Sequence, residues 1–501
     1  MMIQRKKSGL LSLLLVLALL AGCAPAAETP PPGPIPSQSV STPAPTPEPT
    51  PTPAPEPVDF HEFLDGVNAA RKAIVDQKGH IDISAYTPDF REQNNTFTEE
   101  EMELLTTERK FLESLPLEDA LEDVDTFFRL LQTTYGAYYY FGGDEVFLPI
   151  RDAVKEELTA ISIPSTKNQN ETQYLSEAPG RILYKHLSPV LLDGHFMIGQ
   201  YAPRDTFSTY MYYVPDLYRD SVEGAENPGY LKPTIGPDGR ICYWYAALSH
   251  DGSDLPDTLD GISLQWQEAQ WASSDNAAPA FSESEWEGIP ILTSRRMSAG
   301  WENADADEQA LQRLADCGGE YADSPLLIFD VRGNPGGNDL YIMKWFEGWA
   351  GTKAAPRRAF SLRYSQLSCS KFLNGYPAEY MGTFSHYISP GEWAEHSGPV
   401  FVLQDKGTAS SGETAVEFFR TAADTLFVGG PTLGCALTPN NVNLYLPHSG
   451  LQCYFGTGLT FCETDENLDG VGYLPDLWVE PTRAMELTQK LIEFYGLNQP
   501  Q

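Results

Sequence analysis

The stretch PLLIFDVRGNPGG, residues 325–337, decides the fold of this chain. Its first part, 325–330, is a short continuous apolar run, which is typical of a buried strand. Its second part is a turn with consecutive glycines, which a backbone needs where it approaches another group closely or adopts a positive φ. Strand-like and helix-like segments alternate around it, at 291–293, 306–314, 400–404 and 425–428. This alternation predicts an α/β core over residues 289–501.

Two further regions precede this core. Residues 58–196 are predicted to form a helical domain, because apolar residues recur there at helical spacing and Thr98–Glu101 has the form of a capping box. Residues 197–288 contain short runs rich in Tyr, Trp and Thr, broken by frequent turn signals. This pattern predicts a β-rich segment, with one strand at 241–245.

The amino terminus has the features of an export signal. Basic residues at 5–7 precede an apolar run at 10–20, which ends in Leu-Ala-Gly-Cys at Cys23. This ending resembles the bacterial lipobox, which implies that 1–23 is a lipoprotein signal and that a lipid on Cys23 attaches the mature chain to a membrane. Residues 24–57 are rich in Pro, Thr and Ala and are predicted to be an extended tether. The alternative is a transmembrane anchor with a disordered arm, although the apolar run is short for a span. The expected location is extracytoplasmic.

Composition excludes several classes of function. The chain has 501 residues and a net charge of −36, with no basic cluster beyond the signal, so nucleic acid is not an expected partner. Besides Cys23 there are six cysteines without a CxxC pair, so no structural metal is expected. Cys453 and Cys462 are spaced so that they could face each other across a hairpin.

A second small-residue turn, GTASSGE at 407–413, follows the predicted strand 400–404 and begins a predicted helix. A serine at a helix amino terminus is stabilised as a nucleophile by the free N–H groups and the dipole of the helix. Serine is also a preferred N-cap, so this turn alone favours a structural cap over a nucleophile.

The two turns together carry a family resemblance. DVRGNPGG at 330–337, GTASSGE at 407–413 and VGGPT at 428–432, in this order, resemble the tail-specific, or C-terminal processing, serine proteases and their tricorn-like relatives. The resemblance implies a crotonase- and ClpP-like α/β core and hydrolysis of peptide bonds. It also implies that Ser410 is the nucleophile and that N–H groups of Ser411 and of the Gly336-Gly337 turn bind the oxyanion.

The general base of the best-known family members is absent. They use a lysine from a segment that corresponds to 429–435, and Cys435 occupies the lysine position here. Lys406 is interpreted as a solvated loop charge. Other members use Ser-His-Glu arrangements with the histidine in a D-x-H segment, which matches Asp193 to His195. We therefore predict His195 as the base, with His186 as the second candidate and His448 as a residue of a strand turn.

The acid that would orient His195 is expected just before the Gly472–Asp476 segment, by comparison with the tricorn-like pattern. Asp469 and Glu466 are the two candidates. The same acidic loop offers alternating oxygen ligands at Asp465, Asn467 and Asp469, so calcium binding is an alternative, although an EF-hand glutamate is missing.

The predicted function is therefore that of an extracytoplasmic serine endopeptidase that acts through an acyl-enzyme on a protein or peptide substrate, without a metal or organic cofactor. The mechanism requires the helical domain to dock on the α/β core. One alternative is a catalytically silent lipoprotein that binds peptides, and another is Cys435 as a nucleophile. Residues 200–288 show no carboxylate-binding loop of the PDZ type, so tail specificity is not expected to transfer.

Overall fold

The computed structural model describes residues 57–499 apart from 78–80, 94–95, 113, 165–172, 176–178, 273–276, 301–302, 352–354, 373–377 and 397. The predicted signal with Cys23 and all of the predicted tether before residue 57 lie outside the described residues. Among the described helices, none combines the length and apolarity needed to cross a membrane.

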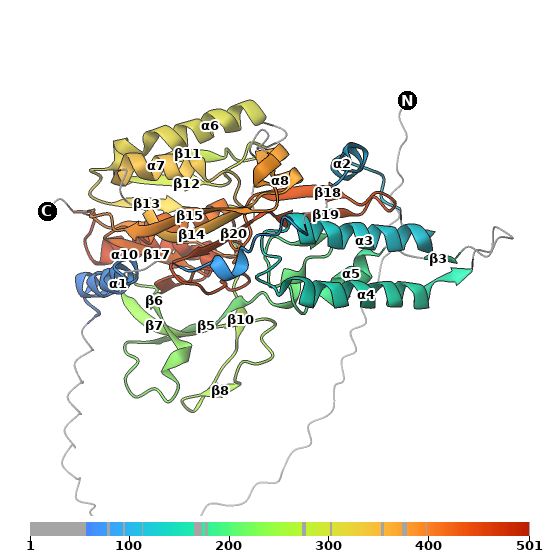
Figure 1. The fold of residues 1–501 in the computed structure, drawn as a ribbon. Coiled ribbons are helices and arrows are strands. Elements are labelled where there is room, and N and C mark those ends of the chain that lie inside the picture. The colour runs from blue at the N-terminus through green and yellow to red at the C-terminus, as the bar shows by residue number, and fades with distance from the viewer. Residues whose placement is uncertain are drawn as a thin grey trace, which may run out of the picture. The chain divides into compact units, whose positions relative to one another are not determined.

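A six-stranded sheet forms the centre of the α/β core (Figure 1). Its first two strands are antiparallel and the remaining neighbours are parallel. In spatial order the strands are β11 (Phe281–Trp286), β12 (Ile289–Ser294), β13 (Leu327–Asp330), β16 (Val400–Gln404), β17 (Thr425–Gly429) and β21 (Leu477–Trp478). The predicted α/β fold class is confirmed by this sheet and its helices, although the sheet begins at β11, before residue 289.

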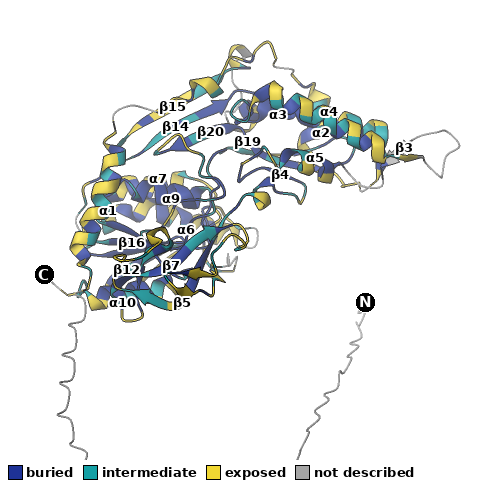
Figure 2. Ribbon diagram, turned by 90° about the horizontal axis from the view of Figure 1, so that it is seen from below, coloured by how far each residue is buried: buried dark blue, intermediate teal, exposed yellow. Residues whose placement is uncertain are grey.

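The central strands are buried on both faces, as their continuous apolar sequences predict. Along β13, Leu327 and Phe329 pack on one side of the sheet and Ile328 packs on the other, which is the two-residue period of a strand. On the first side lie α6 (Ala304–Cys317), α7 (Leu340–Ala350) and α9 (Ser411–Phe419); on the second lie α1 (Phe60–Val75) and α10 (Ala484–Phe494). Every residue of α9 is buried, and the helix is dark blue in Figure 2.

Residues 197–288 hold a second sheet, with strand order β10-β5-β7-β6. The elements of this segment are β5 (Tyr210–Arg219), β6 (Leu231–Ile235), β7 (Ile241–Ser249), β8 (Thr258–Leu259), β9 (Ile262–Ser263) and β10 (Gln267–Glu268). The strand predicted at 241–245 is part of β7.

Most of the remaining amino-terminal elements form a helical layer. They are α2 (Glu99–Thr106), α3 (Leu117–Thr134), α4 (Gly143–Ile161) and α5 (Gly180–Leu187), with the short strands β1 (Leu115–Pro116), β2 (Ile163–Pro164), β3 (Gln173–Leu175) and β4 (Met197–Ile198). The predicted capping box is present, because Thr98 N–H donates to Glu101 and Glu101 N–H donates to Thr98 Oγ1. Helix α1 differs from this group, since Phe60 and Leu64 pack against the core sheet.

Two small sheets join the helical layer to the core. One has the order β15-β14-β20 and the other β18-β19-β4, so the segment that follows His195 is hydrogen-bonded to a strand of the carboxy-terminal region. The remaining elements are β14 (Ala355–Arg363), α8 (Gln366–Phe372), β15 (Phe384–Glu392), β18 (Asn441–Tyr445), β19 (Gln452–Gly456) and β20 (Gly458–Cys462). The docking that the mechanism requires is therefore made.

Arg363 connects β14 to the helical layer. Its guanidinium donates to the carbonyls of Gln132 and Tyr135 and lies 3.9 Å from the ring centroid of Phe90. The side chain is fully buried, and burial lowers the pKa of Arg363 to about 10.

We expect Arg363→Ala to lower the free energy of unfolding by about 3 kcal/mol or more, because it leaves a cavity and two carbonyls without their donor. Arg313→Ala, which removes a surface ion pair with Glu283 and Glu320, is the control and is expected to cost about 1 kcal/mol or less. Urea unfolding of both variants measures the difference. Equal small losses would contradict a structural role for Arg363 in the docking.

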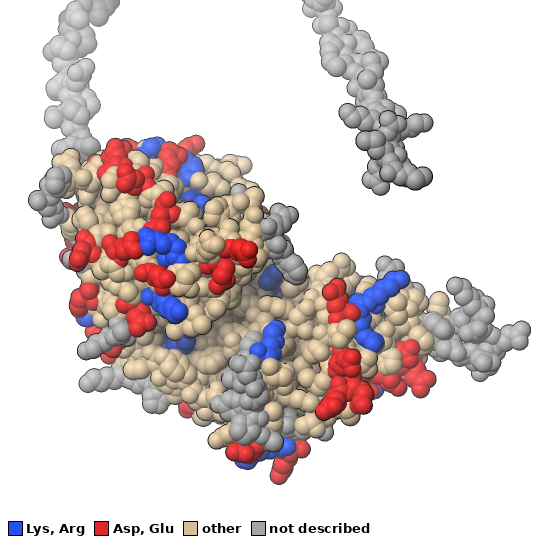
Figure 3. Space-filling model, turned by 90° about the horizontal axis from the view of Figure 1, so that it is seen from above, with Lys and Arg blue, Asp and Glu red and all other residues tan. Residues whose placement is uncertain are grey.

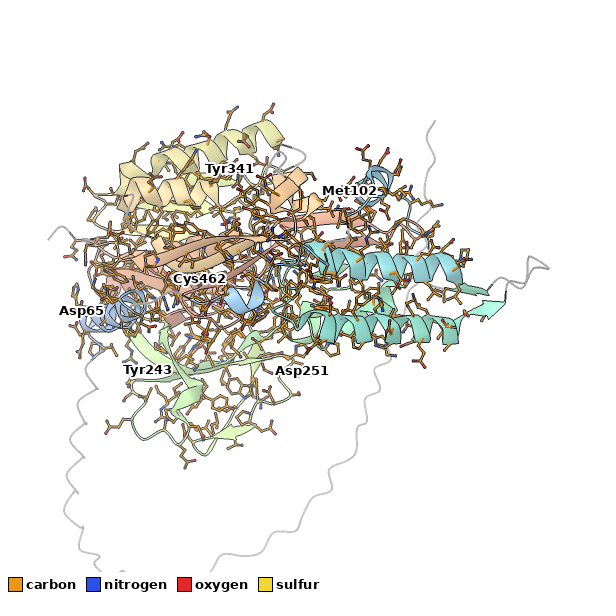
Figure 4. The ribbon with its side chains drawn as sticks, viewed as in Figure 1. Asp65, Met102, Tyr243, Asp251, Tyr341 and Cys462 are labelled. Atoms are coloured by element: carbon orange, nitrogen blue, oxygen red, sulfur yellow. The ribbon has the colours of Figure 1, made fainter. Side chains whose placement is uncertain are left out.

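The proposed pairing of Cys453 with Cys462 is wrong. Cys453 lies on β19, which pairs with β18 and β4. Cys462, which is labelled in Figure 4, lies on β20, which pairs with β14. Both cysteines are free thiols in buried positions. Strand β20 leaves β19 for another sheet, which the spacing of the two cysteines could not reveal.

Candidate active site

Ser410 lies in the turn between β16 and α9 and has an unusual backbone conformation. Its φ is 50° and its ψ is −120°, which costs a residue other than glycine about 1–3 kcal/mol. Such strain persists where the surrounding structure holds it, and a strained strand-to-helix turn presents the side chain of a nucleophilic serine. Ser411 is buried and is the first residue of α9.

The glycine turn after β13 packs directly against this serine. A Cβ atom added at Gly336 would lie 2.7 Å from Ser410 Cβ and 2.9 Å from the Ser411 nitrogen. At Gly337 it would lie 2.0 Å from the carbonyl oxygen of Met297. Only glycine fits at these two positions, so the turn predicted to face the nucleophile does so.

The N–H groups of the turn are not equivalent. Gly336 N–H donates to Asn334 Oδ1 at 2.9 Å, so it is not available for an oxyanion, contrary to our prediction. Within the described part of the chain, the N–H groups of Gly337 and Ser411 have no acceptor. These two N–H groups are the candidate oxyanion donors that remain.

We expect Gly336→Ala to reduce peptidase activity about 100-fold, since the added Cβ displaces the Ser410 backbone. Gly288→Ala is the matched control, because Gly288 also has a positive φ, of 81°, but nothing lies within 4 Å of an added Cβ. Both variants carry the backbone cost of a left-handed alanine. Peptide hydrolysis rates, measured beside thermal unfolding, separate the two effects, and equal activities would contradict the assigned contact.

His195 is buried near this turn, at the point where the helical layer meets the core. A Cβ added to its neighbour Gly194 would lie 2.8 Å from Cys435 Cα. Cys435 is in turn close to Ser410, because the N–H groups of both residues donate to Oε2 of Glu413. Burial, with a smaller contribution from Arg204, lowers the pKa of His195 to about 4. The imidazole is therefore neutral at pH 7. It makes no hydrogen bond with Ser410 in the described structure, and such bonds are often long without substrate.

The predicted pairing of His195 with an acid is not made. Asp469 accepts the N–H groups of Gly194, Ala436 and Leu437, so both its oxygens are occupied by backbone. The side chain of Glu466 is exposed, and the buried Nδ1 of His195 has no partner among the described atoms. The same backbone contacts occupy the Asp469 oxygens that a calcium ion would need, and the described residues contain no cluster of three or more metal-binding side chains.

Asp193 is a buried residue of the D-x-H segment, and we assigned its carboxyl group no role from the sequence. Its oxygens accept hydrogen bonds from Tyr135 Oη at 2.6 Å, from Thr438 Oγ1 and from the His195 N–H. Burial and the charge of Asp469 raise the pKa of the Asp193 carboxyl group above its usual range. Asp193 and Asp469 thus hold the backbone on either side of Gly194.

The other two histidines that we considered lie elsewhere. His186, on α5, has its Nε2 2.8 Å from Glu157 Oε2, and His448 has its Nε2 2.9 Å from Glu122 Oε2. Both are held by glutamates of the helical layer, on α4 and α3 respectively.

The prediction that Lys406 is a solvated loop charge is wrong, because its side chain is buried. Its Nζ donates to the carbonyls of Leu433 and Gly470 at 3.0 Å and 2.9 Å. Burial lowers the pKa of Lys406 to about 8. The ammonium therefore joins the loop before Gly434 to the loop after Asp469.

Glu413 and Cys435 complete the buried surroundings of Ser410. Burial raises the pKa of Glu413 to about 7 and raises the pKa of the Cys435 thiol well above its usual range. Cys435 is thus a protonated thiol, which does not support it as a nucleophile. A Glu three residues after the serine fits the S-x-x-E capping pattern, the one signal in the sequence that could have singled out Glu413.

The surface carries mixed charge. On the face in Figure 3, lysines and arginines lie among acidic side chains and form no separate basic patch. This distribution agrees with the net charge of −36 and offers no footprint for a nucleic-acid backbone on that face.

A serine at the start of a buried helix packs on a glycine turn at the end of a parallel strand, and this arrangement lies in the part of the chain that matches a peptidase family. Residues 292–479 match the model of peptidase family S41, so this part of the chain is similar to that family. The match contains Ser410, the glycine turn and Asp469, and it begins after His195. The family resemblance predicted from the three motifs is thereby confirmed. No curated protein matches the sequence.

Three solved structures illustrate the similarity of this chain to known folds. Mature CPAF is 12% identical, with 76% of this chain and 96% of that chain covered and a TM-score of 0.40. A putative peptidase from Parabacteroides merdae is 17% identical, with 77% and 98% covered and a TM-score of 0.37. The photosystem II D1 C-terminal processing protease is 12% identical, with 73% and 93% covered and a TM-score of 0.32.

Proposed function

We propose that this protein is a serine endopeptidase that cleaves protein or peptide substrates through an acyl-enzyme. The observation that carries the proposal is the strained backbone of Ser410 in contact with Gly336, beside the N–H groups of Gly337 and Ser411, which have no acceptor among the described residues. An attacking serine needs donors for the charge that develops on the carbonyl oxygen, and each donor is typically worth about 100-fold to 1,000-fold in rate.

In this proposal His195 is the general base. A neutral imidazole accepts the Ser410 proton and returns it to the leaving amine. Gly194, next to His195, packs on Cys435, which supports a position close to the nucleophile. Asp469 supports the base by holding the Gly194 backbone rather than by contacting the imidazole.

We further propose that the enzyme acts outside the cytoplasm, attached to a membrane by a lipid on Cys23. The lipobox-like sequence supports this location, and the Pro-rich segment would serve as a tether. Metabolic labelling with a fatty-acid probe, lost in Cys23→Ala, tests the anchor independently of activity.

A fluorophosphonate probe tests the proposed activity. The intact protein is expected to form a covalent adduct, and mass spectrometry of its peptides is expected to locate the adduct on Ser410. An adduct on another residue, or none between pH 6 and 9, would overturn the proposal.

Two observations favour a catalytically silent peptide-binding protein as the second candidate. The buried Nδ1 of His195 has no carboxylate partner among the described residues, and Cys435 stands where many relatives have lysine. Such a protein would bind peptides without forming the adduct.

A further inference from the structure

Glu413 is a fully buried carboxylate that the proposed mechanism leaves without a role. It lies in the first turn of α9, three residues after Ser410, and is 1% exposed. Oε2 accepts the N–H groups of Ser410 at 3.2 Å and Cys435 at 2.8 Å. Oε1 accepts the Gly434 N–H at 2.9 Å and Thr432 Oγ1 at 2.6 Å. The carboxylate thus has a donor at each of its lone-pair positions.

These four hydrogen bonds join two segments that are far apart in the sequence. One is the turn that carries Ser410, and the other is the loop 432–435, which replaces the lysine-bearing segment of many relatives. The opposite side of this loop touches the segment that carries His195, because a Cβ at Gly194 would lie 2.6 Å from Gly434 O. The Glu413 carboxylate therefore connects the turn that carries Ser410 to the loop that contacts Gly194, the neighbour of His195.

We propose that Glu413 is a positioning residue of the peptidase, whose carboxylate fixes the Ser410 backbone to the loop 432–435 and so sets the spacing between Ser410 and His195. This role rests on the proposed function. The left-handed backbone of Ser410 is costly and persists only where neighbouring groups hold it. Because a displacement of about 1 Å can cost about 100-fold in rate, a side chain that holds this backbone controls activity without touching substrate.

The chain supplies a matched control one helical turn further on. Glu417, also on α9 and 2% exposed, pairs with Arg358 and accepts the Tyr473 hydroxyl at 2.9 Å. It makes no contact with Ser410 or with the loop 432–435 in the described structure. Changing it to glutamine removes a buried charge from the same helix and leaves the support of the nucleophile intact.

The experiment compares Glu413→Gln with Glu417→Gln by the rate constant and the end-point of fluorophosphonate labelling at pH 8.5, where Glu413 is ionised. The glutamine NH₂ of Glu413→Gln replaces one acceptor oxygen, so it faces N–H donors. We expect its labelling rate to fall by about 10-fold to 100-fold while the end-point still reaches one adduct per folded molecule. Glu417→Gln is expected to unfold at a lower temperature but to label within about threefold of the wild-type rate.

The outcomes distinguish failure of the positioning role of Glu413 from failure of the proposed peptidase function. Wild-type labelling on Ser410 with an unchanged rate in Glu413→Gln would overturn the positioning role and leave the proposed function intact. Absence of wild-type labelling would overturn both. Equal slowing in both variants would assign the effect to helix stability and also overturn the role. If the glutamine variant does not fold, Glu413→Asp, which keeps the charge but is one methylene shorter, decides by the same rate criterion.

Discussion

Ser410→Ala is expected to abolish hydrolysis of a peptide substrate, with a loss of about 10⁴-fold or more, because no acyl-enzyme can form without the hydroxyl oxygen. The fold should be unaffected, since the Ser410 side chain is half-buried and the alanine keeps the backbone N–H that Glu413 accepts. The measurement is the initial rate of peptide cleavage beside the thermal unfolding temperature.

The neighbouring serine provides the control. Ser411→Ala removes a hydroxyl from the next residue but keeps the N–H group that we assign to the oxyanion, so its activity should stay within about tenfold of wild type. If Ser411→Ala is the inactive variant and Ser410→Ala is active, the assignment of the nucleophile is wrong.

The second large effect is expected for His195→Ala, which should lower the hydrolysis rate by about 10³-fold or more through loss of the base. Lys406→Met is the decisive comparison, because Lys406 is the buried lysine whose Nζ joins the loops on either side of this site. With His195 as the base, Lys406→Met should retain activity within about tenfold. The opposite ranking would make Lys406 the base.

The pH dependence of the wild-type rate tests the same assignment. The lowered pKa of His195, about 4, means that the imidazole is already in its base form well below neutral pH. The rate should therefore stay level between pH 8 and 9.5, where Glu413 is also fully ionised. A lysine base with a pKa of about 8 would instead make the rate rise across this interval, as Lys406 loses its proton.

Contacts between distant segments explain where sequence reasoning failed. Lys406 stands beside Asp405 in a small-residue loop, which predicted solvation, yet two carbonyls from residues 433 and 470 close over its ammonium. Asp469 is a candidate acid because it lies just before the Gly472–Asp476 segment, but in the structure it accepts three backbone N–H groups and none from His195. A local sequence pattern does not predict which hydrogen-bond donor from a distant segment a carboxylate will accept.

Local physical chemistry was enough for the α/β core, for the glycine turn and for Ser410 at the start of α9, because buried strands, left-handed turns and helix starts each restrict residue type within a few positions. Only the tertiary structure decided that Lys406 is buried and that Glu413 joins the nucleophile to the loop beside His195. These features depend on pairs such as Lys406 with Gly470, 64 residues apart. Hydrogen bonds over such separations are set by the packing of whole layers, which one sequence does not encode in any short stretch.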